Sequence, residues 1–477
     1  MDSAKLTARI EKAWEESIVP AITEYIRIPA KSPAFEPEWA AKGHLHAAVK
    51  LIEGWCKKRP IAGLTTEIVE LPGRTPVLFM EIPASGAEGP IEGADTVLLY
   101  GHYDKQPEFL PWAEGLSPWE PVRQGDRLYG RGGADDGYAA FASLLAIEAL
   151  GCAGGRHARC VVVIEGCEES GSYDLPHYID HLKARIGTPS LVVCLDSGCG
   201  NYDQLWLTTS LRGLVTGNLR VEVLREGLHS GDASGVVPSS FRILRNVLDR
   251  IERSDTGEIL LRSLHPEIPE ERRRQASETA QVLGKDSFAR FPWADGTTPM
   301  VSDATELVLN RTWRPFLSVT GAEGLPALGS AGNVLRPFTS VKLSLRLAPT
   351  TDPAAARTEL IEALTKEPPH GATVTFKSEQ GASGWNAPAT APWLKKSLSE
   401  ASQAFFGKPV CAMGEGGTIP FMAMLGDKFP EAQFVITGVL GPQSNAHGPN
   451  EFLHIPTGKK LTSVVAQILD DHLKRER

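Results

Sequence analysis

The first half of the sequence alternates between two patterns of hydrophobic and polar positions. Stretches near residues 3–27, 138–150 and 174–185 repeat apolar residues every three or four positions, and between them lie the apolar runs TTEIVEL, PVLFMEI, TVLLYGH, CVVVIEG and SLVVCLD. The repeat predicts helices, and the short β-branched runs predict strands. Strands that alternate with helices in this way indicate an α/β domain with a mostly parallel mixed sheet flanked by helices.

After about residue 211 the pattern changes. The runs LVTGNLRVEVL and TSVKLSLRLAP alternate apolar and polar residues, and helices are predicted near 239–252 and 353–366. Such alternation is typical of an antiparallel sheet with helices on one face. We therefore expect a separate α+β domain here.

The first pattern returns after the Pro- and Gly-rich stretch 381–392. A helix is predicted near 392–406, a strand at QFVITGV and a closing helix near 456–474. We therefore predict a discontinuous catalytic domain of residues 1–211 and 385–477. Residues 212–384 would form an inserted lid and dimerisation domain.

Composition and charge narrow the class of function. Of the 477 residues, 42% are apolar and 22% charged, as in a soluble enzyme, and the net charge is -9. An acidic chain without a basic stripe is not expected to bind nucleic acid. The charged first thirty residues do not fit a signal peptide, and no apolar stretch reaches the roughly 18 residues of a membrane helix. We expect a cytoplasmic protein that binds no membrane.

Residues that bind divalent metals stand mostly where the predicted strands end. They are His102 and Asp104 in VLLYGHYD, Asp135 and Asp136 in GRGGADDG, Glu168 and Glu169 in EGCEESGS, Asp196 in CLDSG, and His447 in SNAHGPNE. Histidines and carboxylates at the carboxyl ends of strands form a ligand set that suits Zn²⁺, Mn²⁺ or Co²⁺. The pattern indicates a metallohydrolase.

Spacing within these segments supports this interpretation. Asp104 follows His102 by two residues and can accept the other ring N–H, which fixes the tautomer. The glycines before Asp135 permit a tight loop that brings carboxylates to a charged centre, where one aspartate could bridge two metals.

Other classes of site fit less well. Counted from Gly130, a dinucleotide-binding GxGxxG would need a glycine where Asp135 stands. Glu168 and Glu169 are adjacent and would diverge, unlike the paired carboxylates of a glycosidase. No GxSxG motif indicates a serine hydrolase.

Two further features have structural explanations. The seven cysteines lack CxxC spacing and are expected to be buried free thiols rather than ligands. The Trp-rich stretch 105–122 fits internal packing better than a pocket wall.

In order and wording, these segments resemble the di-zinc aminoacylase and dipeptidase family, which includes glutamate carboxypeptidases and carnosine dipeptidases. The segments GLHSG near 227–231, SLRLAP at 344–349 and GEGGTIP at 414–420 fall in the same order. The subgroup that looks most similar is the carnosine and Cys-Gly dipeptidases. The chain departs from many members at Gly137, which stands where they have a lysine after the Asp pair.

The resemblance implies two divalent metal ions per subunit, with Zn²⁺ preferred over Mn²⁺ or Co²⁺. It also implies a role for each matched residue. His102, Glu169, Asp196 and His447 would complete the two sites, and Asp135 would bridge them. Glu168 would be the general base and Asp104 would orient His102. His229 would cross from a partner subunit of a homodimer to the oxyanion. Arg346 would hold the substrate carboxylate, in a pocket lined by Glu415, Gly416, Gly417 and Thr418.

These roles predict a metal-dependent dipeptidase or carboxypeptidase that acts on a small substrate with a free carboxylate. An N-acyl amino acid amidohydrolase of the same family is the alternative, because Arg346 would serve either substrate. An inactive binding or assembly protein fits less well, because all the ligand types and Glu168 are present.

Overall fold

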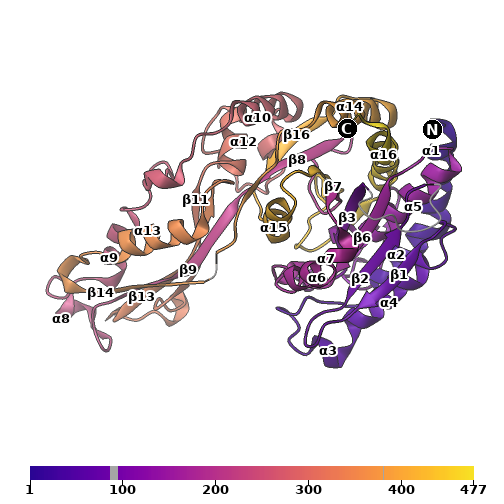
Figure 1. The fold of residues 1–477 in the computed structure, drawn as a ribbon. Coiled ribbons are helices and arrows are strands. Elements are labelled where there is room, and N and C mark those ends of the chain that lie inside the picture. Colours follow the sequence, from indigo (N-terminus) through magenta and orange to yellow (C-terminus); the bar gives the residue numbers. More distant parts are fainter. Residues whose placement is uncertain (86–94, 380, 477) are drawn as a thin grey trace. The chain divides into compact units, whose positions relative to one another are not determined.

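The computed structural model describes residues 1–85, 95–379 and 381–476 (Figure 1). Its contacts divide the chain into two compact units. The first unit is Met1–Thr209, Ala387–Met413 and Met424–Arg477, and the second is Ser210–Asn386 and Gly414–Ala423. The segment 414–423 therefore packs with the second unit, although it falls outside the range 212–384 predicted for the inserted domain.

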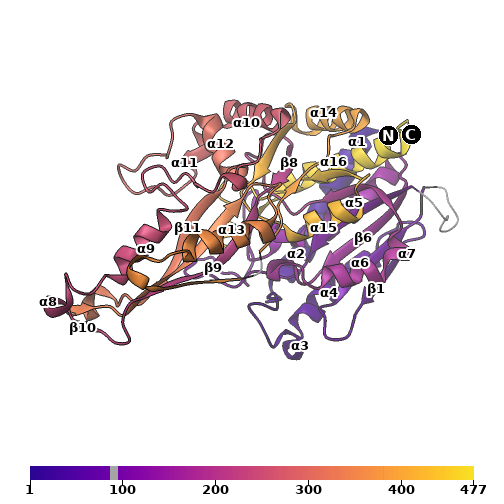
Figure 2. The same cartoon turned by 60° about the vertical axis from the view of Figure 1, so that its left-hand side comes forward.

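A six-stranded mixed sheet forms the centre of the first unit (Figure 2). Strands β6, β3, β7 and β17 run parallel, whereas β1 and β2 are antiparallel additions at one edge. In sheet order the strands are β1 (Thr65–Val69), β2 (Val77–Ile82), β6 (Arg159–Glu165), β3 (Thr96–His102), β7 (Pro189–Cys194) and β17 (Gln433–Ile436). Strand β3 is buried at every position, as its continuous apolar run predicts.

Helices cover both faces of this sheet. One core joins alternate residues of β2, β3 and β6 to α1 (Ser3–Ala13), α2 (Val19–Ile26), α4 (His44–Cys56), α5 (Ala139–Cys152) and α16 (Ile455–Lys474). Residues 139–150 of α5 are all buried, and five of them are alanines, which let the helix lie close to its neighbours. On the other face lie α6 (Leu175–His181) and α7 (Lys183–Ile186), where Arg185 packs over the ring of Phe79.

The first unit contains further helical elements. They are a π-helical turn at Trp14–Ile18, which divides the helix predicted near 3–27, α3 (Trp39–Lys42), and α14 (Pro392–Phe406), whose residues Leu394, Leu398 and Ala401 belong to the same core. The unit boundary falls within β8 (Trp206–Leu211), β16 (Cys411–Glu415) and α15 (Pro420–Lys428).

A small antiparallel sheet joins distant parts of the first unit. Strand β5 (Arg127–Tyr129) pairs with β4 (Val122–Gln124) and with β18 (Phe452–His454), and Phe452 lies opposite Tyr129. This pairing brings the end of the SNAHGPNE segment beside the start of GRGGADDG.

The second unit contains a four-stranded antiparallel sheet in the order β11-β13-β9-β14. Its strands are β11 (Phe316–Glu323), β13 (Phe338–Leu347), β9 (Gly213–Glu222) and β14 (Thr373–Ser378). Buried residues alternate along β9, and they pack against α9 (Ser240–Leu248) and α13 (Pro353–Thr365). The two units confirm the predicted fold class.

The second unit contains further helices and strands, some of which form a small core of their own. The helices are α8 (Ser230–Ala233), α10 (Glu270–Leu283), α11 (Asp286–Ala289) and α12 (Ala304–Thr312), and the strands are β10 (Leu228–His229), β12 (Val334–Leu335) and β15 (Trp385–Asn386). Short 3-10 turns occur at Arg262–Leu264, Leu328–Ser330 and Pro369–Gly371. Throughout the described residues, no helix combines the length and apolar character needed to span a bilayer.

Candidate metal centre

The carboxyl ends of three parallel strands bring the predicted ligands together. His102 is the last residue of β3, Asp196 follows the end of β7 by two residues, and Glu168–Ser170 forms a 3-10 turn shortly after β6. Because β6, β3 and β7 are parallel neighbours, these ends meet at one edge of the sheet.

The first group of potential ligands is His102, Asp135 and Asp196, all buried. The ring atom Nε2 of His102 lies 3.3 Å from Asp135 Oδ1 and 3.7 Å from Asp196 Oδ2. One ligand atom from each residue lies within 4.8 Å of the others.

The second group is Asp135, Glu169 and His447. His447 Nε2 lies 3.1 Å from Asp135 Oδ2 and 3.2 Å from Glu169 Oε2. The two oxygens of Asp135 therefore face different groups, with Oδ1 towards His102 and Oδ2 towards His447. The His447 side chain is 57% exposed, whereas that of Glu169 is only 2% exposed.

The donor atoms of both groups suit divalent cations. His102 Nε2 and Glu169 Oε1 are buried and make no hydrogen bond within the described chain. A buried polar atom without a partner is costly, and a cluster of carboxylates adds mutual repulsion. A cation held by these nitrogen and oxygen atoms would remove both penalties, so the residues fit the ions expected from the sequence.

The protein itself perturbs the acid–base behaviour of these groups. Burial, and then the nearby Asp135, raise the pKa of Glu169 to about 7. Burial also raises the pKa of Asp196, and it raises that of Glu168 well above the ordinary value. Desolvation lowers the pKa of His447, but Asp135 and Glu169 outweigh it and raise that pKa to about 11. Burial thus favours the neutral forms of these carboxyl groups, and a bound cation would favour their ionised forms.

Asp104 supports the ring of His102 and the turn that carries Glu168 and Glu169. Its carboxylate accepts the backbone N–H groups of Glu168 at 3.1 Å and Glu169 at 3.0 Å. The Nδ1 atom of His102 lies 3.1 Å from the carbonyl oxygen of Asp104 and 3.4 Å from its Oδ1. Asp104 therefore holds the ring of His102 through its backbone more closely than through its side chain.

Glu168 stands beside the ligand groups without belonging to either. Its backbone is fixed by Asp104, and no hydrogen bond or ion pair found among the described residues engages its carboxylate. Asp136 lies behind the centre, where its Oδ2 accepts the backbone N–H of His102 at 3.3 Å.

Some supporting residues have no role in the sequence prediction. Gln106 is buried, and its amide donates to Glu169 Oε2 at 2.5 Å. Arg131 and Glu451 form a buried ion pair at 2.7 Å. Arg131 and Glu451 lie within segments that carry predicted ligands, and Gln106 follows Asp104 by two residues, but only the three-dimensional contacts reveal what they touch.

The structure also describes the surroundings of the cysteines and of the Trp-rich stretch. Cys167 and Cys194 are buried free thiols outside both ligand groups, although Cys152 is exposed. In the Trp-rich stretch, the indoles of Trp112 and Trp119 both donate to Glu108, and both side chains are half-buried.

The predicted substrate contacts lie in the second unit. Arg346 on β13 donates to Thr418 Oγ1 at 3.2 Å, and Thr418 donates to the carbonyl of Arg212 at 2.5 Å. Arg212 in turn donates to the carbonyl of Gly416 at 3.2 Å. The segment after Glu415 is thus fastened to β13 through Arg346 and to the turn between β8 and β9 through Arg212, a residue that the sequence alone does not identify.

His229 lies elsewhere in the second unit. It ends the short strand β10, and its exposed ring accepts the N–H of Gly231 at 3.2 Å at the start of α8. Within one chain, this contact is local.

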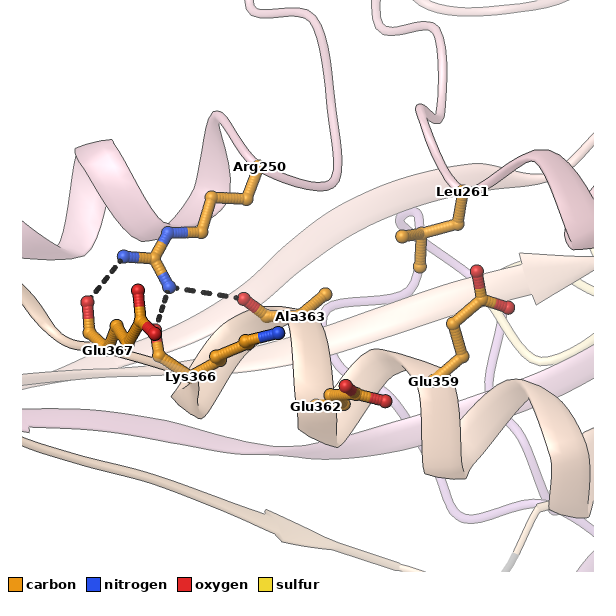
Figure 3. A pocket seen from close by; sticks show the side chains of 7 residues that line it. All are labelled: Arg250, Leu261, Glu359, Glu362, Ala363, Lys366 and Glu367. Atoms are coloured by element: carbon orange, nitrogen blue, oxygen red, sulfur yellow. Dashed lines mark hydrogen bonds between the residues drawn. The ribbon is translucent and has the colours of Figure 1, made fainter.

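The second unit also contains a surface pocket of about 490 Å³, lined by Arg250 and by residues at the end of α13 (Figure 3). Arg250 donates to the carbonyls of Ala363, Lys366 and Glu367, so it satisfies the last turn of α13. The other lining residues are Leu261, Glu359 and Glu362. The pocket lies where Arg250 binds the end of α13, and none of its lining residues is a predicted ligand.

Comparison with known proteins agrees with the geometry. A sequence profile of peptidase family M20/M25/M40 matches residues 98–471. The cysteinylglycine-S-conjugate dipeptidase of Corynebacterium striatum is 27% identical over 371 residues, which are 77% of this chain and 78% of that protein. The Cys-Gly metallodipeptidase of Saccharomyces cerevisiae is 29% identical over 271 residues, which are 54% of each protein.

Solved structures share the fold. A dipeptidase from Saccharomyces cerevisiae has a TM-score of 0.76 and 21% identity, over 100% of this chain and 99% of that one. Human carnosine dipeptidase 1 has a TM-score of 0.74 and 20% identity, over 99% of both chains. Because the family profile spans well over half of its length, the chain belongs to peptidase family M20/M25/M40 and is a metallopeptidase.

Proposed function

We propose that this metallopeptidase is a dipeptidase, or a closely related carboxypeptidase, that uses two divalent metal ions and Glu168 as general base. One observation carries the proposal: two ligand groups share Asp135, with one carboxylate oxygen turned to each. The dipeptidase names of the relatives from Corynebacterium and yeast support the substrate class.

The ions, for which we propose Zn²⁺, would be held by His102, Asp135 and Asp196 on one side and by Asp135, Glu169 and His447 on the other. When bound, they lower the pKa of an attacking water and polarise the amide carbonyl. Asp104 keeps the ring of His102 and the backbone of Glu168 and Glu169 in place for this arrangement.

Glu168 takes the proton from the attacking water and delivers it to the leaving amine. Its carboxylate suits this role because it lies beside the ligands but belongs to neither group. A general base of this kind contributes roughly 10²–10⁴-fold to the rate.

Arg346 would bind the free carboxylate of the substrate, because a guanidinium matches a carboxylate in charge and geometry. Burial lowers the pKa of Arg346, because the guanidinium has lost part of its hydration. The anchored segment of Glu415, Gly416, Gly417 and Thr418 would form the adjacent wall.

We also propose a homodimer formed through the second unit. Several large apolar side chains of this unit are exposed, among them Leu228, Val236, Val319, Leu328 and Val334. Strand β11 also lies at an edge of its sheet. In such a dimer, His229 would act on the oxyanion of the partner's substrate, the role that the family resemblance gives it.

Hydrolysis of a mixed panel tests the proposal. The purified protein is analysed for bound metals and then given dipeptides, N-acyl amino acids and dipeptides amidated at the carboxyl terminus. We expect two ions per chain, cleavage of free dipeptides and weak cleavage of the amidated ones. The matched control Glu168→Gln should bind both ions but turn over several orders of magnitude more slowly.

Two results would contradict this proposal. Preferential cleavage of N-acyl amino acids would show that the protein is an amidohydrolase of the same family and not a dipeptidase. Activity of Glu168→Gln within tenfold of the parent would remove Glu168 from the role of base.

A further inference from the structure

A buried ion pair outside both ligand groups connects the loops that carry them. Arg131 and Glu451 have side chains that are 1% and 0% exposed, and Arg131 Nη1 donates to Glu451 Oε2 at 2.7 Å. Desolvating two charges is so unfavourable that an apolar pair of similar volume is often equally stable. Stability alone therefore does not explain why the pair is there.

The second oxygen of Glu451 holds the loop that leads to Asp135. Oε1 accepts three backbone N–H groups, from Gly132 at 3.0 Å, Ala134 at 3.2 Å and Asp135 at 3.3 Å. Three donors converging on one carboxylate oxygen fix the backbone of this loop. They fix it at the residue whose two oxygens face different ligand groups.

The guanidinium of Arg131 reaches two other loops. Nη2 donates to the carbonyl of Gly448, the residue after His447, at 2.5 Å. Nε donates to the carbonyl of Pro107 at 3.1 Å. The residue before Pro107 is Gln106, whose amide donates to Glu169. The pair therefore contacts the chain next to each member of the second ligand group. Glu451 binds the backbone of Asp135, and Arg131 binds the residue after His447 and the residue after Gln106, which holds Glu169.

The loop of residues 443–450, which carries His447, depends on contacts of this kind. Four of its residues other than glycine have left-handed backbone conformations, namely Gln443, Asn445, His447 and Asn450, with φ of 67°, 54°, 63° and 63°. Asparagine and histidine tolerate this conformation better than most residues, but four such residues in one loop still depend on support from the surroundings. Arg131 binds the carbonyl of Gly448 inside this loop, and Gly130 N donates to the carbonyl of Glu451 at its end at 3.0 Å.

We propose that Arg131 and Glu451 are positioning residues for the metal centre, which lock the loops of Asp135 and His447 into one arrangement without touching metal or substrate. The inference rests on the proposed function, because it assumes that the ligand groups bind ions. Loss of the pair should loosen Asp135 and His447 together and so weaken both sites. Substrate binding, which depends on Arg346 in the second unit, should change little.

Glu451→Gln in the full-length protein tests the proposal. The variant keeps the size of the side chain, but in either orientation its amide N–H₂ faces donors, which are the Arg131 guanidinium or the backbone N–H groups of the Asp135 loop. Zn²⁺ affinity is measured by competition with a chromophoric chelator, together with kcat, KM and the thermal unfolding midpoint. We expect metal affinity and kcat to fall about 10–100-fold, the range for residues that orient ligands, with KM within threefold of the parent.

Glu148→Gln is the matched control. Glu148 is also a buried carboxylate paired with arginines, Arg9 and Arg59, but it lies near the end of α5, roughly 14 Å along the helix from Ala139. This variant should lower the unfolding midpoint and leave metal affinity within twofold of the parent.

A second variant covers the case in which Glu451→Gln does not fold. Arg131→Lys keeps the charge but cannot make all three contacts, so it should lose affinity while remaining folded. Parent-like affinity in a folded Glu451→Gln or Arg131→Lys would overturn the proposal. Failure of both variants to fold would also overturn it, by making the pair a requirement of folding. A parent protein that binds no metal would contradict the proposed function instead.

Discussion

Asp135 occupies the position at which the two ligand groups meet. Because Oδ1 faces His102 and Oδ2 faces His447, replacing this residue affects both groups, whereas Asp196 belongs to only one. We expect Asp135→Ala to lose both ions and Asp196→Ala to lose mainly one. Elemental analysis after dialysis measures the loss, and loss of a single ion from each variant would contradict a shared ligand.

Glu165 makes stability depend on pH. Tyr100 and Ser172 both donate to its Oε1, at 2.5 and 2.8 Å, and burial raises the pKa of the carboxyl to about 8. The folded protein thus holds this proton more tightly than the unfolded chain, whose glutamates titrate near pH 4.3. The stabilisation is complete below that value and is lost as the pH rises through about 8.

Glu165→Gln cannot ionise and should escape this loss. From pH 6 to pH 8 we expect the variant to gain on the order of 2–3 kcal/mol of unfolding free energy relative to the parent. Urea denaturation at both pH values measures the difference. An identical pH dependence in the two proteins would show that Glu165 does not titrate in this range.

At the scale of single elements, α13 illustrates how local sequence fixes a boundary. Asp352 accepts the N–H of Ala354 at 2.9 Å, Pro353 begins the helix, and Arg250 satisfies its last carbonyls. Asp352→Ala should therefore destabilise the protein by about 0.5–2 kcal/mol. Chemical denaturation measures the change, with the exposed Glu362→Ala of the same helix as control. Equal effects of the two variants would argue against a cap.

The elements that the sequence predicts best have long, regular patterns. Strand β3 and helices α5 and α16 lie close to their predicted positions, because their apolar residues fill one continuous core. Shorter elements such as β8 and β16 are not predicted. Their few residues carry no period of their own, and pairing with distant strands decides their conformation.

In the candidate metal centre, too, some residues can be predicted from the sequence and others cannot. His102, Asp135, Glu169, Asp196 and His447 stand out in the sequence because of their residue types, and the structure brings them together. Arg131 and Glu451 do not stand out, because they act through backbone groups of loops that only the β5–β18 pairing makes neighbours. Arg212, and the packing of the segment 414–423 with the second unit, also escape prediction, because they depend on contacts such as that of Arg212 with Gly416, 204 residues away in the sequence.

At the scale of the whole molecule, the proposed dimer has a direct test. Inactive Glu168→Gln and inactive His229→Ala subunits are mixed under conditions that allow exchange. If His229 acts on the partner's site, a hybrid dimer contains one site with both groups intact. Since a random mixture is half hybrid, we expect about a quarter of the parent activity to return. Confirmed exchange without recovery would exclude a role for His229 in the partner's site.

The distribution of the ligands along the chain also bears on biosynthesis. His102, Asp135 and Asp196 are all made within the first two hundred residues, whereas His447 follows some 250 residues later and Glu451 after it. Chains fold from the amino terminus as they emerge from the ribosome. A half-finished chain therefore presents one ligand group complete, but without the carboxylate that orders the Asp135 loop. Truncated products would expose these acidic side chains without the geometry of the finished centre.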